Sequence, residues 1–296
     1  MCKERTRSAR AAERLALLAL SESCPAPSSA DLRRMADTLA YDLVEHGVQR
    51  GDRVGVLRAQ GAWCAAAHIA VWKLGAISIP LFKLFRHDAL AARVWDGAAK
   101  IIVTDDEGQG MVADLPGVTA LIPENLPLSD RPFPTADTTP EDPAVLIYTS
   151  GTTGSPKGAL HAHRVLTGHL PGVEMSHDFL GQSEDVLWTP ADWAWIGGLF
   201  DVLMPGLALG VPDLAARLPK FTAPEAARII RDAQVRNVFF PPTALRMLKA
   251  EGQTIPGLRS VASGGEPLGA EMLAWGRAAL GVTINEFYGQ TECNMV

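Results

Sequence analysis

The chain has 296 residues, a net charge of −6 and 47% hydrophobic residues, enough for one large domain or two small ones. No basic stripe supports nucleic-acid binding, and no apolar run approaches the roughly 20 residues of a membrane-spanning helix. The four cysteines, Cys2, Cys24, Cys64 and Cys293, are spaced neither as a disulfide framework nor as a zinc site. We therefore expect a cytoplasmic protein without a membrane span.

The first 30 residues are rich in arginine and alanine. They lack the apolar core and cleavage site of a secretory signal, and Glu4 and Glu13 argue against a transit peptide. We expect a poorly packed extension of uncertain order, or a helix, rather than a targeting segment.

Regular patterns begin at residue 31, where Leu32, Met35, Leu39 and Leu43 recur at helical spacing. The elements predicted next are a helix at 31–47, a turn and strand at 50–57, a buried helix at 61–75, and strands at 76–82 and 99–106. Residues 123–143 contain six prolines and few large apolar side chains, which predicts a surface linker.

A second series of elements follows the linker. It consists of a strand at 144–150, a helix from about His161, helices at 223–234, 244–252 and 270–280, and strands at 235–242, 258–268 and 282–292. Short strands that alternate with helices predict an α/β fold with layered, mostly parallel sheets flanked by helices.

A loop rich in small and hydroxylated residues follows the strand at 144–150. Residues 148–158 read YTSGTTGSPKG, here named the phosphate loop, and combine backbone N–H groups, hydroxyls and one lysine that suit an anion. The Walker motif does not fit, because Pro156 precedes Lys157 and Gly158 follows it, where that motif needs a serine or threonine.

Two more loops follow predicted strands, which is where open α/β sheets bind ligands. The adenine loop, residues 262–269, reads ASGGEPLG, and Gly264 and Gly265 would let a flat group lie against the backbone. Residues 285–292 read NEFYGQTE. Each has a simpler interpretation alone: a tight turn for the glycines, a solvated acid for Glu292 and a core residue for Tyr288.

Taken in this order, YTSGTTGSPKG, SGGEPL and EFYGQTE resemble the adenylate-forming (AMP-binding) superfamily over about residues 31–296. TPADWAWIGG and the QTE ending are most similar to the acetyl- and medium-chain acyl-CoA synthetases. The resemblance implies an enzyme that joins a carboxylate to AMP with release of pyrophosphate and then passes the acyl group to CoA.

The resemblance also implies roles for individual residues. The β- and γ-phosphates of ATP would be held by Thr149, Ser150, Gly151, Thr152, Thr153, Gly154 and Lys157. The adenine would lie between Gly265, Glu266 and Pro267 on one side and Tyr288 on the other, with Glu286 accepting from its amine. Thr291 would bind the α-phosphate and Glu292 would hold Mg²⁺, so Thr291, Glu292 and Lys157 are the expected catalytic residues.

The acyl pocket is expected at Trp195 and Gly289. Core packing is the alternative for Trp195 and the favoured interpretation of Trp193. Acetyl-CoA synthetases resemble this chain but carry a tryptophan at the place of Gly289. The resemblance therefore implies a carboxylate longer than acetate, from propionate to medium chain, with an acetate-specific enzyme as the alternative.

Other polar residues are given structural roles. A carboxylate nucleophile is ionised at pH 7 and needs no general base. We expect His161 and His163 on the helix after the phosphate loop, and assign no chemistry to His169, Asp185, Asp192 or Asp201.

The chain also departs from the family pattern. The resemblance implies an incomplete large N-terminal domain without its β-barrel part and C-terminal lid, with layers of about 60–180 and of 30–60 with 185–296. The three loops would meet between these layers. A fragment of this kind is expected to be an impaired ligase. A non-catalytic nucleotide- or acyl-binding remnant is the main alternative, and a kinase is disfavoured by the missing Walker hydroxyl.

Overall fold

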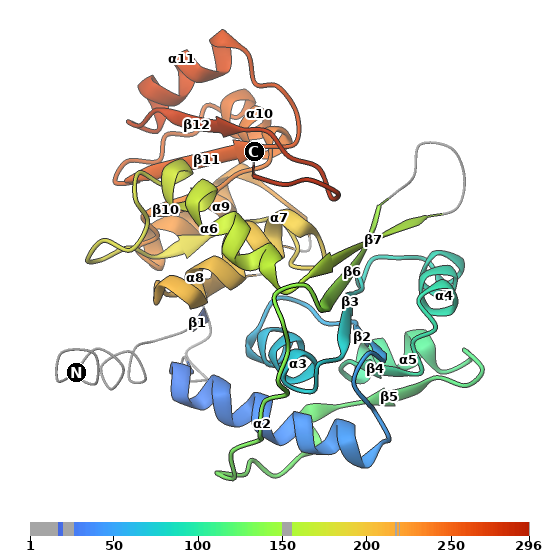
Figure 1. The fold of residues 1–296 in the computed structure, drawn as a ribbon. Helices are drawn as coiled ribbons and strands as arrows, with labels where there is room; N and C mark the ends of the chain where they lie inside the picture. The colour runs from blue at the N-terminus through green and yellow to red at the C-terminus, as the bar shows by residue number, and fades with distance from the viewer. Residues whose placement is uncertain (1–16, 20–26, 150–155, 217, 219, 296) are drawn as a thin grey trace, which may run out of the picture. The chain divides into compact units, whose positions relative to one another are not determined.

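The computed structural model describes residues 17–19, 27–149, 156–216, 218 and 220–295. They form two compact units, one of residues 30–165 and one of residues from 166 onward together with the described residues before 30. Each unit has its own six-stranded sheet (Figure 1). The fold is therefore α/β with two mostly parallel sheets flanked by helices, which confirms the predicted class.

The unit of residues 30–165 is built on a sheet with the strand order β5-β4-β2-β3-β6-β7. Its strands are β2 (Arg53–Val56), β3 (Ile77–Pro80), β4 (Ile101–Val103), β5 (Thr119–Leu121), β6 (Pro143–Thr149) and β7 (Lys157–Ala162). All neighbours are parallel except β6 and β7. Because β2 lies between β4 and β3, residues 53–56 belong with this sheet and not with the strands after residue 185.

Helices cover this sheet. They are α2 (Ser29–Glu45), α3 (Ala62–Lys73), α4 (His87–Asp96) and α5 (Asp106–Val112), and a 3₁₀ turn follows at η1 (Pro123–Asn125). Leu90 of α4 and Val112 of α5 pack with Ile79 and Ile102 of the sheet in one buried cluster. The short elements α4, α5 and β5 were not predicted, whereas α2 and α3 confirm the helices at 31–47 and 61–75.

The proline-rich segment predicted as a surface linker is bound along the helices. The Tyr41 hydroxyl of α2 donates to Pro132 O at 3.0 Å, and its ring contacts Phe133 edge to face at 4.9 Å between centroids. Ala136 N donates to Lys73 O at the end of α3 at 2.8 Å. The segment therefore has no regular structure of its own after η1, yet it is attached to the unit.

The prediction that a helix begins at about His161 is wrong. Residues 157–162 form β7, which pairs antiparallel with β6 from Thr149↔Lys157 to Val145↔His161, and α6 begins only at Arg164. His161 thus lies on a strand, and His163 lies in the turn before α6 with its N–H donating to Asp142 O. The Gly- and Thr-rich loop is therefore the connection of a β-hairpin rather than a strand-to-helix loop.

The other unit has an all-parallel sheet with the order β1-β9-β8-β10-β11-β12. Its strands are β1 (Leu17–Ala19), β8 (Leu187–Trp188), β9 (Asp213–Ala215), β10 (Asn237–Phe239), β11 (Ser260–Gly264) and β12 (Ile284–Phe287). Its helices are α6 (Arg164–Ser176), α7 (Ile196–Gly198), the π-helical turn η2 (Leu199–Leu203), α8 (Met204–Leu209), α9 (Ala223–Asp232), α10 (Pro242–Ala250) and α11 (Ala270–Ala279).

Both faces of this sheet are covered. Successive residues of a strand point to opposite faces. Accordingly Val238 packs in a cluster with α9, α10 and α11, whereas Phe239 packs in another with α6 and η2. Helices on both faces of a parallel sheet leave its carboxyl edge as the ligand-binding edge.

Part of the N-terminal segment also belongs to this sheet. Leu17–Ala19 form β1, which pairs in parallel with β9. These three residues form a strand instead of the expected extension or helix, because this short apolar stretch pairs with the edge of β9. Residues 1–16 and 20–26 lie outside the described residues.

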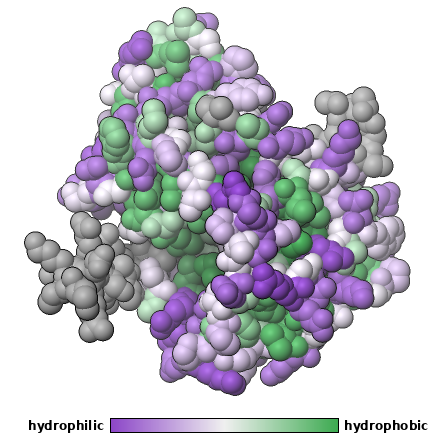
Figure 2. Space-filling model, viewed as in Figure 1, coloured by the Kyte–Doolittle hydropathy of each residue, from purple (hydrophilic) through white to green (hydrophobic). Residues whose placement is uncertain are grey.

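The surface is of mixed polarity. On the face drawn in Figure 2 hydrophilic residues are interspersed with hydrophobic ones. Across the part of the chain that the structure describes, no helix combines the length and the hydropathy needed to cross a membrane.

Candidate functional site

The phosphate loop connects β6 to β7. Thr149 pairs with Lys157 at the end of this hairpin next to the loop, and the Thr149 hydroxyl donates to Lys157 O at 3.4 Å. Gly158 packs closely against its neighbouring strand, since a Cβ there would lie 2.7 Å from Leu146 Cδ1. Lys157 is exposed, so its ammonium group is accessible to an anion. Ser150, Gly151, Thr152, Thr153 and Gly154 lie outside the described residues.

The adenine loop begins where β11 ends. A Cβ on Gly264 would lie 2.5 Å from the Phe287 ring, so this glycine admits the ring of the neighbouring strand. Gly265 has φ +104°, a conformation that side chains disfavour, and has open space where a side chain would lie. Of the two glycines predicted to accommodate a flat group, Gly264 therefore serves the protein's own packing, and Gly265 has room beside it.

Contacts between elements hold the adenine loop. Glu266 forms an ion pair of 2.7 Å with Arg246 of α10, and Arg246 also donates to Pro267 O at 3.5 Å. From β12, Glu286 Oε1 accepts from Leu268 N at 2.9 Å. The register Ser263↔Glu286 places these groups at one carboxyl edge. Arg246 was not predicted, since its partner lies 20 residues further along the chain.

A tight turn follows β12, here named the acidic turn (Gln290–Cys293). Gln290 and Cys293 exchange both backbone hydrogen bonds, at 3.0 and 3.1 Å, so Thr291 and Glu292 form its tip. Glu292 is exposed there. Tyr288 precedes the turn and is 63% exposed, which differs from the core position considered for it. The chain therefore presents an aromatic face, a hydroxyl and a carboxylate within five residues.

The residue after the acidic turn occupies space beside Gly289. A Cβ on Gly289 would overlap Asn294 Oδ1 and would lie 3.2 Å from Asn294 Cα. The missing side chain of Gly289 is thus compensated by an amide from the same chain. Trp195, the other residue expected at the acyl pocket, immediately precedes α7 and is half-buried, whereas Trp193 is fully buried.

Asn294 is bound to a buried carboxylate. Asn294 Nδ2 donates to Asp201 Oδ1 at 2.6 Å, and His169 Nδ1 lies 3.5 Å from the same oxygen. Asp201 is 3% exposed and lies in η2. Burial raises the pKa of the Asp201 carboxyl, and the hydrogen bonds from His169 and Asn294 oppose this shift. No sequence pattern indicates this group, because Asn294 and His169 are 93 and 32 residues away from Asp201 along the chain.

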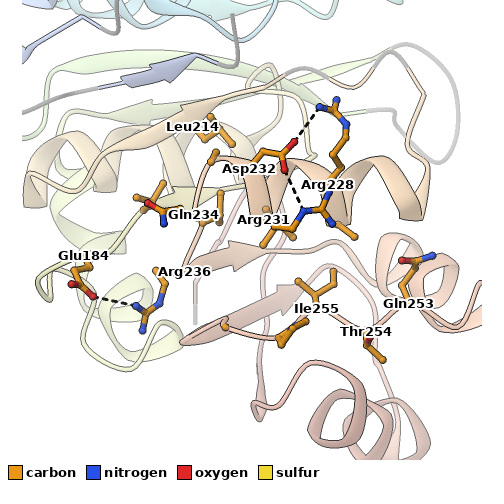
Figure 3. A pocket seen from close by; sticks show the side chains of 17 residues that line it. Glu184, Leu214, Arg228, Arg231, Asp232, Gln234, Arg236, Gln253, Thr254 and Ile255 are labelled. Atoms are coloured by element: carbon orange, nitrogen blue, oxygen red, sulfur yellow. Dashed lines mark hydrogen bonds and ion pairs between the residues drawn. The ribbon is translucent and has the colours of Figure 1, made fainter. Parts of the chain in front are cut away.

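A groove of the second unit lies at the opposite edge of the sheet. Its volume is about 1190 Å³, and its lining includes residues that precede β8, β10 and β11 (Figure 3). Arg236 pairs with Glu184 at 3.4 Å, and Arg228 and Arg231 both pair with Asp232, at 3.4 and 3.3 Å. No predicted site residue lines this groove, and ligand binding in parallel sheets favours the carboxyl edge instead.

A metal site made of protein ligands alone is not found among the described residues, where no three His, Cys, Asp or Glu side chains cluster suitably. Mg²⁺ commonly takes one or two carboxylates and completes its shell with phosphate oxygens and water. The single exposed carboxylate of Glu292 fits that mode of binding.

Glycine-rich and hydroxyl-rich loops that follow the strands of α/β units are typical of nucleotide-binding proteins. The family model described as AMP-binding enzyme matches residues 6–296. The chain therefore belongs to the AMP-binding enzyme family, which confirms the resemblance.

Curated relatives include acetyl-coenzyme A synthetases. Acetyl-coenzyme A synthetase 2 of Candida albicans is 28% identical over 310 residues, which covers 90% of this chain and 44% of that protein. The Pseudomonas aeruginosa protein of the same name is 28% identical over 305 residues, or 87% of this chain and 46% of that protein. The chain thus spans about half the length of the curated relatives it matches.

Solved structures show the same fold. An acyl-CoA synthetase from Brucella canis superposes with a TM-score of 0.81 at 30% identity, covering 95% of this chain and 55% of that one. ATP-bound MatB from Rhodopseudomonas palustris gives a TM-score of 0.80 at 26% identity, covering 95% and 58%. The matched part is the large N-terminal domain of this fold.

Within the second unit, the structure brings the adenine loop, Glu286, Tyr288 and the acidic turn to one edge. Thr149 and Lys157 belong to the other unit. The meeting of the phosphate loop with the other two loops stays a prediction.

Proposed function

We propose that this chain carries the carboxylate-activating site of an AMP-forming acyl-CoA synthetase, which makes an acyl-adenylate from ATP and then a thioester with CoA. One observation carries the proposal. The adenine loop and the acidic turn follow two adjacent parallel strands at their carboxyl ends, and a hydrogen bond from Leu268 N to Glu286 joins the adenine loop to β12, the strand that precedes the acidic turn. Membership of the AMP-binding enzyme family gives this arrangement its chemistry.

Adenylation needs a bound nucleotide and little proton transfer. A carboxylate oxygen of the substrate attacks the α-phosphorus of ATP, the bond from that phosphorus to the oxygen bridging to the β-phosphate breaks, and pyrophosphate leaves with the electron pair. The substrate is already ionised at pH 7. The protein's task is therefore to stabilise the charge that develops on pyrophosphate, which we assign to Lys157, Thr149 and the rest of the phosphate loop.

The adenine ring is assigned to the space beside Gly265. Glu266 and Pro267 form one wall, fixed by Arg246, and the exposed Tyr288 ring stacks on the other side. A carboxylate has about four acceptor positions, so Glu286 keeps acceptor capacity for the exocyclic amine while it binds Leu268 N.

The acidic turn is assigned to the α-phosphate and the metal. The Thr291 hydroxyl donates to an α-phosphate oxygen, and Glu292 supplies the protein ligand to Mg²⁺. When bound, Mg²⁺ neutralises phosphate charge. In the second half-reaction the CoA sulfur attacks the acyl carbon, the bond from that carbon to the AMP oxygen breaks, and the thiol proton passes to solvent.

The acyl group is proposed to be longer than acetate, with Trp195 and Gly289 at its pocket. Each additional buried CH₂ contributes about 0.8 kcal/mol to binding. The amide of Asn294 beside Gly289 and the names of the curated relatives favour acetate as the alternative. The two alternatives predict different rates of pyrophosphate exchange with acetate and with longer acids.

Exchange of label between pyrophosphate and ATP tests the proposal. The 296-residue chain is incubated with MgCl₂, ATP, labelled pyrophosphate and acetate, butyrate or octanoate in turn. We expect exchange that depends on the acid and is greatest with a longer one. Lys157→Ala should slow it about 10²–10³-fold, whereas Lys100→Ala, which removes an exposed lysine before β4, should leave it unchanged. ATP binding without exchange for any acid would instead indicate a non-catalytic nucleotide-binding protein.

A further inference from the structure

The acidic turn is attached to the unit by more than its own backbone. Its two backbone hydrogen bonds close the turn but do not fix its orientation relative to the rest of the unit. The two residues after the turn fix that orientation. Asn294 binds Asp201 of η2, and Met295 lies against α6, where a Cβ on Gly172 would be 3.0 Å from Met295 Cβ. These contacts all lie within one unit.

The anchor for Asn294 is unusual in three ways. Asp201 is a carboxylate with 3% exposure, so it is buried rather than at a solvated edge. It lies in a π-helical turn, and such turns frequently occur at functional sites. Its oxygen is shared by Asn294 at 2.6 Å and by His169 of α6 at 3.5 Å, so groups from three elements meet at one atom.

The contact between Asp201 and Asn294 lies next to the residues assigned to the α-phosphate and the metal. Asn294 is two residues from Glu292, and its amide oxygen lies against Gly289, on the other side of the turn. The side chain of Asn294, which follows the acidic turn, therefore lies against Gly289, which precedes it, while Asp201 binds the same side chain. A hydrogen bond to an ionised or buried carboxylate is stronger than one between neutral groups.

We propose that Asp201 is a positioning residue which, through Asn294, holds the acidic turn so that Thr291 and Glu292 face the α-phosphate and its metal. This inference rests on the proposed function for the identity of the ligand. The positioning of the turn is independent of the proposed function, because the effect of Asp201 on the turn is measurable without any nucleotide.

The first measurement is hydrogen exchange of the Gln290 and Cys293 amides, read residue by residue by NMR in the nucleotide-free chain. Asp201→Ala and Asn294→Ala should each accelerate exchange at both amides by about tenfold, equal to about 1.4 kcal/mol. Asp201→Asn retains an oxygen that accepts from Asn294 and should exchange as the unchanged chain does. Asp213→Asn is the matched control, since it alters another fully buried carboxylate of the same unit.

Equal exchange at Gln290 and Cys293 in Asp201→Ala and in the unchanged chain would overturn the proposal. So would an equally large acceleration in Asp213→Asn, because that result would indicate general loosening of the unit.

The second measurement is the ratio of ATP affinities with MgCl₂ and with EDTA, by calorimetry. Asp201→Ala and Asn294→Ala should lower this ratio about tenfold, and the double variant should lower it no further, because both remove one interaction. Asp201→Asn should restore it. A purely structural role would weaken both affinities alike and leave the ratio unchanged, which would overturn the proposal.

If the unchanged chain binds no ATP while exchange at the turn still responds to Asp201→Ala, the proposed function fails and the positioning by Asp201 stands. If ATP binds and neither the exchange nor the ratio responds, the proposed function stands and the positioning by Asp201 is contradicted.

Discussion

Replacing Asp213 with valine is expected to stabilise the unit that contains it, and to do so more at pH 7 than at pH 4. Asp213 lies in β9, between β1 and β8, and is fully buried. Neither of its carboxylate oxygens has a hydrogen-bond partner among the described residues, and Gly206 packs directly against both. This carboxyl group is therefore an uncompensated polar group in the core.

The magnitude follows from burial. A buried polar group without a partner costs about 1–3 kcal/mol. Burial also raises the pKa of Asp213 well above its ordinary value of 3.8, so the folded chain retains a proton that the unfolded chain releases. The free energy of unfolding then falls as pH rises from that value toward the raised pKa, by up to about 1.4 kcal/mol per pH unit. Valine removes both penalties and suits a buried strand.

Urea unfolding at pH 4.5 and pH 7.5, followed by circular dichroism, measures this effect as a difference from the unchanged chain. Asp213→Val should unfold at higher urea at both pH values, with the larger gain at pH 7.5. Asp213→Asn is the control, since it removes the titration and keeps the polar atoms, so its gain should be smaller than that of valine and should increase from pH 4.5 to pH 7.5. A valine variant that is less stable, or whose gain does not depend on pH, would refute this reasoning.

Four further outcomes are expected. Tyr288→Ala should weaken ATP binding about tenfold while Tyr288→Phe does not, because stacking on a base contributes about 1–3 kcal/mol; calorimetry measures both. Lys157→Ala should slow pyrophosphate exchange about 10²–10³-fold at unchanged thermal stability. Gly289→Trp combined with Asn294→Gly should shift kcat/KM from octanoate toward acetate. The same selectivity in the variant and the unchanged chain would contradict the assignment of Gly289 to the acyl pocket. Burial lowers the pKa of His68 to about 3, so acidification below its ordinary value of 6.5 should destabilise the unchanged chain, and His68→Leu should reduce that loss in urea unfolding.

The parts of the fold that were predictable are those whose sequence pattern matches their environment. The helical spacing of Leu32, Met35, Leu39 and Leu43 predicts α2, because all four residues are buried. Strand β7 was missed for the opposite reason. It is an edge strand with half-exposed and exposed residues, and its pairing with β6 is visible only once the hairpin closes.

The candidate site was predictable where function depends on local chemistry. Glu266, Tyr288 and Glu292 lie in short motifs, and the parallel order of β11 and β12 brings their loops to one edge. The supporting contacts were not predictable, because they join distant segments: Asn294 with Asp201, and Arg246 with Glu266. The sequence likewise indicated that Gly264 admits a ligand, whereas the structure shows the Phe287 ring against it.

The central claim is that this chain activates a carboxylate by joining it to AMP, and oxygen labelling tests it most directly. The chain is incubated with MgCl₂, ATP, CoA and octanoate labelled with ¹⁸O in its carboxylate, and the nucleotide product is analysed by mass spectrometry. The account predicts AMP that contains one ¹⁸O, since the attacking carboxylate oxygen stays on phosphorus when CoA takes the acyl group. Formation of ADP and labelled orthophosphate, or of AMP without label, would contradict it.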